Sequence, residues 1–196
     1  MVQPRTLTIL IMLGDLKHAF EILLREKRKN PALLNIYSFI DICAALVNDG
    51  KTENRAIFEA CLAEFAMMAR KPFSTYDLWA ARCSLLHAYS PLGRHTEKPN
   101  GARPIFYYSW PETQNEMETV LKARGYADFI LLNVEDIKWV AVDVLNSLHR
   151  KIDSDPAFEE RFLQNARHFL YDLQAFKLEA ELSMLQELDR HGRGDT

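Results

Sequence analysis

The sequence predicts a mainly α-helical protein with a small strand–helix–strand insertion and a long C-terminal helix. Apolar residues recur at helical spacing along most of the 196 residues. Only 7 of these residues are glycine, which suits long helices better than a fold with many turns. One short aromatic run, at residues 105–110, interrupts the helical pattern and favours a β-strand.

The first half of the chain is expected to form four helices, separated by Pro31, by the turn at residues 48–50 and by Pro72. The second of them has apolar residues nearly all round, which predicts a central helix. The fourth is expected to start at Ser74 or Thr75, because either hydroxyl can cap the free N–H groups of a helix start. The predicted ranges are residues 7–29, 33–48, 53–70 and about 74–89.

The strand–helix–strand insertion is expected over residues 105–134. Pro111 suits the first turn of its helix, and Gly125 suits the position just after that helix ends. A second β-prone run, at residues 129–134, supplies the other strand.

Helical spacing resumes after the insertion. Helices are expected at residues 135–151 and 156–188, and the polar tail 190–196 is expected to be disordered. Because no linker or repeat interrupts the chain, residues 1–196 are interpreted as one domain.

The formal net charge is −3, so the overall charge of the protein repels polyanions and argues against binding them through net charge alone. Residues 70–103 depart from this average, since they carry six basic residues against two acidic ones. A local basic region of this kind is compatible with contact to nucleic acid.

The cysteines and the apolar runs indicate a cytoplasmic protein without a membrane segment. The 3 cysteines form no CxxC pair and lie in apolar helical patterns, which predicts reduced thiols. The apolar run at residues 7–13 is too short to span a bilayer and lacks a signal-peptide cleavage site. The sequence contains no phosphate-binding loop, dinucleotide-binding fingerprint or zinc ribbon, so no cofactor and no metal are expected.

The candidate for chemistry is the pair Arg82 and His87, an R-x4-H arrangement inside the fourth helix. Arg82 lies in a run of core residues, where an arginine is costly unless it has a partner or a task. His87 comes at the helix end, just before a basic loop that is rich in proline and glycine. A second match of the pattern, from Arg161 to His168, lies on an acidic helix and is interpreted as solvated surface.

Residues 78–90 resemble the motif segment of the HEPN superfamily, whose helical domains carry R-x(4–6)-H late in their sequence. The resemblance implies a HEPN-like helical bundle, a homodimer with two motifs facing one cleft, and an endoribonuclease that cleaves RNA without a metal ion. It also implies a defence or toxin–antitoxin context, with a cognate antitoxin or other protein partner. Arg82 and His87 are the catalytic residues under this resemblance.

These residue types suit the cleavage of RNA. Histidine changes its protonation state near neutral pH, so His87 can act as the base or the acid, and Arg82 can pair with a phosphate. Five residues turn a helix by about 140°, so one copy does not bring both side chains onto one phosphate, and the dimer is part of the hypothesis. The candidate RNA-binding residues are Arg94, Lys98 and Arg103.

Other interpretations of the motif stay open. Arg82 can form a structural ion pair with Asp77 or Asp41. Many active HEPN members carry a polar residue directly after the motif arginine, and Cys83 in that position leaves open a non-catalytic module that binds nucleic acid or protein. A further alternative is structural zinc, which needs four ligands, and the sequence candidates for it are Cys83, His87 and His95.

Overall fold

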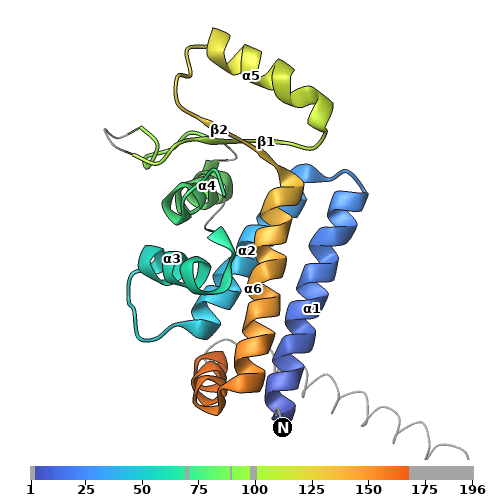
Figure 1. Ribbon diagram of the computed structural model, residues 1–196, viewed down its shortest axis with the longest axis vertical. Helices are drawn as coiled ribbons and strands as arrows, with labels where there is room; N and C mark the ends of the chain where they lie inside the picture. The colour runs from blue at the N-terminus through green and yellow to red at the C-terminus, as the bar shows by residue number, and fades with distance from the viewer. Residues whose placement is uncertain (1–2, 69–70, 89, 98–100, 168–196) are drawn as a thin grey trace, which may run out of the picture.

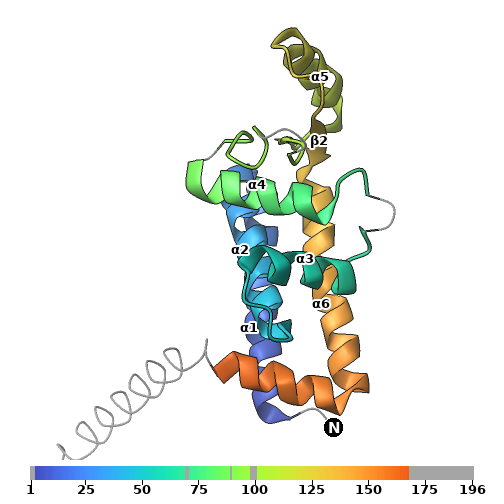
Figure 2. The same cartoon turned by 90° about the vertical axis from the view of Figure 1, so that its left-hand side faces the viewer.

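The computed structural model describes residues 3–68, 71–88, 90–97 and 101–167. The long helices run alongside one another, and shorter helices cross them (Figures 1 and 2). A two-stranded sheet lies at one end of this group, with a further helix on its outer side. The prediction of a mainly helical protein is therefore confirmed.

The elements follow the predicted order. They are α1 (Pro4–Arg25), α2 (Lys29–Val47), α3 (Asn54–Phe65), α4 (Thr75–Ala88), β1 (Ile105–Tyr108), the short 3-10 helix η2 (Pro111–Thr113), α5 (Gln114–Ala123), β2 (Ile130–Asn133) and α6 (Val134–Ser154). Residues 156–167 are also helical. The rest of the predicted 156–188 helix and the tail 190–196 lie outside the described residues, so the single domain over 1–196 stays a prediction.

The central position predicted for the second helix is confirmed in α2, which packs against α1, α3 and α6. Its Phe39 is buried and meets Phe20 of α1 edge to face, with ring centroids 5.7 Å apart. Burying one such side chain contributes about 2 kcal/mol. α2 is the one described helix that is long and apolar enough to cross a membrane, but half of its apolar window is buried inside the fold. Its apolar surface is thus that of a core helix.

Residues 156–167 cross one end of the long helices and are tied to them by polar contacts. The Glu159 carboxylate accepts from the N–H of Gln3 at 2.8 Å and from the hydroxyl of Thr6 at 2.7 Å. The Asn165 amide donates to the carbonyl of Leu46 at 2.9 Å. These bonds join the last described segment to both α1 and the end of α2.

The first helix ends four residues before its predicted limit at residue 29. Lys27 adopts a left-handed backbone conformation with φ of 58°, which no helix can continue through. The N–H of Arg28 donates to the carbonyl of Leu23 at 2.7 Å, and that of Lys27 to Leu24 at 3.0 Å. This is a Schellman motif, which usually has glycine at the left-handed position. Because that position holds a lysine here, the sequence contained no signal for the end of the helix.

The strand–helix–strand insertion is confirmed as a parallel pair of strands joined through α5. Ile105 of β1 pairs with Ile130 of β2 in the register of the sheet. Both side chains are buried in the core. On the opposite face, Phe106 meets Tyr126 and Phe129 with ring centroids 5.1 and 6.1 Å away. The sheet therefore lies between the helical core and α5 (Figure 1).

The left-handed Lys27 generates a prediction of stability. Lys27→Gly is expected to raise the free energy of unfolding by about 0.5–1 kcal/mol, because glycine adopts this conformation without the steric cost of a Cβ atom. Glu26→Gly, one residue earlier at a φ of −76°, is the matched control and is expected to bring no gain. Urea unfolding of the three proteins measures the difference, and equal stabilities of wild type and Lys27→Gly would contradict the argument.

Candidate functional site

α4, which carries the R-x4-H pattern, begins at a reciprocal cap. The N–H of Asp77 donates to the Ser74 hydroxyl at 3.0 Å, and the N–H of Ser74 donates to the Asp77 carboxylate at 2.8 Å. These bonds occupy N–H groups that a helix start otherwise leaves free. The predicted start at Ser74 or Thr75 is confirmed, since the helix begins at Thr75.

Arg103 binds the same carboxylate from the segment just before β1. Its backbone N–H donates to Oδ1 of Asp77 at 2.8 Å, and its Nη2 donates to Oδ2 at 2.9 Å and to the carbonyl of Pro72 at 2.8 Å. We call this cluster of Pro72, Ser74, Asp77 and Arg103 the Asp77 junction. Burial by itself raises the pKa of the Asp77 carboxyl, but the hydrogen bonds from Ser74 and Arg103 outweigh it and lower that pKa.

Arg82 lies in the middle of α4 and forms an ion pair with Asp41 of α2. Its Nε donates to Oδ2 of Asp41 at 2.8 Å, and its Nη2 lies 2.7 Å from the same oxygen in the ion pair. The guanidinium also lies over the ring of Trp79, 5.0 Å from its centroid, and Nη1 contacts the sulfur of Cys83 at 3.9 Å. Of the two carboxylates considered as structural partners, the fold selects Asp41, because Asp77 is occupied at the helix start.

The Arg82–Asp41 pair is half-buried, with 22% and 27% of the two side chains exposed. Burial raises the pKa of the Asp41 carboxyl, and the hydrogen bonds and charge of Arg82 offset only part of that rise. Burial opposes the charge of Arg82, but Asp41 outweighs it and raises the pKa of the guanidinium. Arg82 stays charged, and Asp41 occupies the Nε–Nη2 edge that would otherwise hold a phosphate.

His87 lies in the last turn of α4, and its side chain is outside the described part of the structure. The regular helix between the two positions places the Cβ of His87 about 140° around the axis from that of Arg82. The backbone of α4 therefore places the two motif positions of one chain on different sides of the helix.

The three candidate RNA-binding residues have different surroundings. Arg94 is exposed, and its Nε donates to Nε2 of His95 at 3.3 Å. Arg103 is held in the Asp77 junction, with 38% of its side chain exposed. Lys98 lies outside the described residues. RNA binding by these residues stays a prediction. Arg103 has an acidic partner in Asp77, whereas no described acidic residue forms an ion pair with Arg94.

The zinc alternative gains no support from the described residues. Among them, no three histidine, cysteine or acidic side chains lie close enough to hold a metal ion. Cys83 contacts Arg82, and the ring of His95 meets that of Tyr76 edge to face, with centroids 6.4 Å apart.

A pocket of about 260 Å³ opens beside α4, between α2, β1 and α5. Arg82 is not part of its lining. On its β1 side, the carbonyl of Tyr107 accepts from Nζ of Lys29 at 3.1 Å, and the Tyr107 hydroxyl hydrogen-bonds that of Tyr37 in the core. Burial raises the pKa of both phenols. The pocket walls include Leu33, Ala81, Leu85, Ile105, Phe106 and Met117.

A second hollow, which we call the strand groove, runs between α5 and β2. Its volume is about 350 Å³. Its lining comes from α5, from residues 127–131, and from Pro72 and Arg103 at the Asp77 junction. Sequence reasoning missed this groove, although a strand–helix–strand unit with two strands necessarily has two outer strand edges.

No family model matches this chain, and no curated protein and no solved structure is significantly similar to it. The likeness of residues 78–90 to the HEPN motif therefore stays a prediction.

The Asp77 junction predicts a pH-dependent contribution to stability. Asp77→Asn is expected to lower the free energy of unfolding at pH 7 by about 2 kcal/mol, because a buried carboxylate with charged and backbone donors is lost. Since folding lowers the pKa of this carboxyl, its contribution is present above the unfolded value of about 3.9 and disappears as the pH falls through the folded value.

Urea unfolding of wild type and Asp77→Asn between pH 7 and pH 3 measures this contribution. Ser74→Ala is the control that removes part of the cap and leaves the carboxylate. A stability difference between wild type and Asp77→Asn that stays constant over this pH range would contradict the assignment.

The Arg82–Asp41 pair is expected to show energetic coupling. Arg82→Ala and Asp41→Ala should each destabilise the fold, and the double variant should lose about 1 kcal/mol less than the sum, because each single change leaves a half-buried charge unpaired. The exposed i, i+4 pair Glu118 and Lys122 is the matched control, with an expected coupling of about 0.3–0.5 kcal/mol. Additive effects at Arg82 and Asp41 would mean that the contact contributes nothing to stability.

Proposed function

We propose that this protein is a non-catalytic helical interaction module in which Arg82 has a structural role. The observation that carries the proposal is the ion pair of Arg82 with Asp41, in which Nε donates to Oδ2 and Nη2 lies against the same oxygen. A phosphate at that position has to displace the carboxylate or approach a negative charge, and both cost free energy.

The distribution of open surface supports the same proposal. The α4 pocket and the strand groove are both formed by residues other than Arg82. The α4 pocket is lined mainly by apolar side chains with a few polar ones, which is the usual composition of binding sites. The strand groove is more polar, because its lining includes Arg103, Gln114, Glu118, Lys122 and Asp128. Arg103, a candidate RNA-binding residue, already donates to Asp77 and to the carbonyl of Pro72, which is a structural role.

The second candidate function is the metal-independent, homodimeric endoribonuclease that the HEPN resemblance implies. Two observations favour it: Nη1 of Arg82 is outside the ion pair, and Arg94 is exposed on the segment that follows α4. Two copies would have to set Arg82 of one chain against His87 of the other. RNA, a cognate protein partner and a cytoplasmic location belong to this candidate as proposals.

One experiment separates the two functions. Wild type, Arg82→Ala and His87→Ala are incubated with several RNAs in excess EDTA, and the folding of each protein is checked by circular dichroism. Arg161→Ala is the matched control, because Arg161 begins the other R…H match and is exposed.

The interaction module predicts no cleavage above background by any of the four proteins. Cleavage by wild type and Arg161→Ala that is lost in both Arg82→Ala and His87→Ala would replace the proposal with the ribonuclease.

A further inference from the structure

We propose that the open edge of β2 is a docking site for an extended segment of a partner protein, which joins the sheet as a third strand beneath α5. The inference rests on the proposed function, because it names the kind of partner that the interaction module binds.

The hydrogen-bonding pattern of the sheet defines this edge. The N–H of Ile130 donates to the carbonyl of Pro104 at 2.9 Å, so Ile130 faces β1. Backbone groups of neighbouring residues in a strand point to opposite sides, and the N–H and carbonyl of Leu131 therefore point away from β1. Within the described part of the chain, no loop or side chain hydrogen-bonds these two groups.

The outer edge of β1 differs from that of β2. Its Tyr107 carbonyl accepts from Nζ of Lys29, so the start of α2 already covers it. Exposed strand edges are templates for pairing, and natural proteins usually cover, twist or charge them. No described residue covers the edge of β2, and the fold also supplies a groove at this position.

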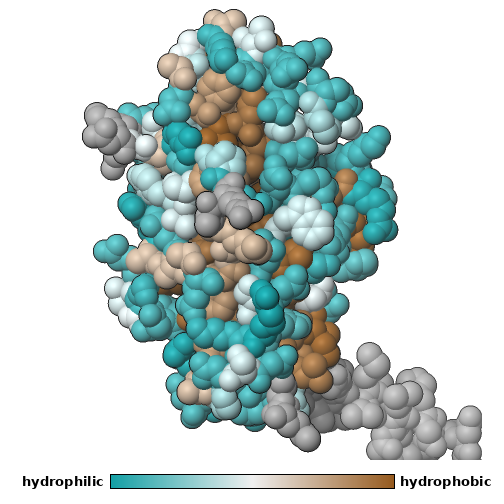
Figure 3. Space-filling model, viewed as in Figure 1, coloured by the Kyte–Doolittle hydropathy of each residue, from teal (hydrophilic) through white to brown (hydrophobic). Residues whose placement is uncertain are grey.

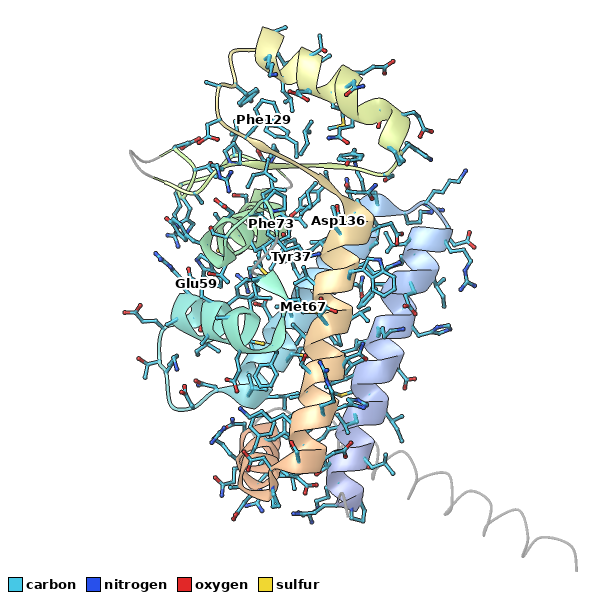
Figure 4. All side chains as sticks on the ribbon, in the orientation of Figure 1. Tyr37, Glu59, Met67, Phe73, Phe129 and Asp136 are labelled. Atoms are coloured by element: carbon cyan, nitrogen blue, oxygen red, sulfur yellow. The ribbon has the colours of Figure 1, made fainter. Side chains whose placement is uncertain are left out.

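The strand groove has the dimensions of a short strand. Gln114, Glu118 and Lys122 form its α5 wall, four residues apart, which spans about 12 Å along a helix. The four residues of β2 span about 13 Å in an extended chain. Apolar surface lies exposed in the hollow beneath α5 (Figure 3), and Phe129 lies there between α5 and the core (Figure 4).

The groove favours a single extended segment over a second copy of the chain. A strand that pairs with Leu131 has to lie between α5 on one side and Pro72 with Arg103 on the other. β2 of a second copy would bring its own α5 to this edge, and that helix would need room beside the first α5. A segment without attached secondary structure meets no such conflict, which is the usual condition for adding a strand to a sheet edge.

The lining also indicates the chemistry of the segment. Phe129 and Leu131 supply apolar surface, which suits apolar side chains at alternate positions. The charged residues of the lining have both signs and balance, so a segment of low net charge is favoured over a strongly acidic or basic one. They are Arg103, Glu118, Lys122 and Asp128.

The test uses random linear 12-residue peptides displayed on phage, selected against the intact chain. Peptides with alternating apolar residues and dissociation constants of about 1–100 μM are expected for an interface of this size. Binding should slow hydrogen exchange at the Leu131 amide at least about tenfold, because that N–H gains a partner in the ladder. Methylating alternate backbone nitrogens of the peptide in one register should abolish binding, and in the other register should not.

Two variants of the chain locate the site. Glu118→Trp fills the groove and should weaken binding at least about tenfold, whereas Glu116→Trp, exposed on α5 outside the groove, should not. Leu131→Pro, which removes the edge N–H, should act like Glu118→Trp, and the α5 variants keep the test decisive if the proline variant does not fold.

The inference is overturned if no peptide is enriched, or if selected peptides bind equally to Glu118→Trp and leave the Leu131 amide unchanged. This result is distinct from failure of the proposed function, which the RNA-cleavage series decides through Arg82 and His87 without involving the groove.

Discussion

The carboxylate of Asp77 is the contact on which the arrangement of the two parts of the molecule depends. It caps α4 through Ser74 and holds Arg103 by backbone and side chain, two residues before β1 begins. The position of β1 sets that of β2 through their register, and β2 leads directly into α6, whose first turn is capped by the Asn133 side chain. One buried charge thereby links the helical core to the strand–helix–strand unit.

The pair of Arg82 and Asp41 shows how little a motif spacing says about the role of its arginine. A guanidinium in a helix of core residues needs compensation for its charge, and either a phosphate or a carboxylate supplies it. Here the carboxylate comes from α2, 41 residues earlier in the chain. The same residue type at the same spacing thus fits a catalytic site and a structural ion pair, and the partner decides between them.

The sheet is unusual in its size and in what covers it. Parallel strands normally belong to larger sheets with helices on both faces. Here two strands of four residues lie between the helical core and α5, and one outer edge is capped by Lys29. The other edge faces the strand groove, where no described residue hydrogen-bonds the N–H and carbonyl of Leu131.

By itself the sequence determined the helical class, the central role of α2, the start of α4 and the strand–helix–strand order, because helical periodicity, caps and β-prone runs are local signals. The end of α1 was not predicted correctly from the sequence, because Lys27 adopts a left-handed conformation that is usually occupied by glycine. From the sequence, two carboxylates, those of Asp77 and Asp41, were candidate partners of Arg82. Only the packing of α2 against α4 selected Asp41. The groove beside β2, and the edge of β2 that no described residue covers, were also decided by the tertiary structure alone, because the elements that pack around a sheet determine which of its edges stays uncovered.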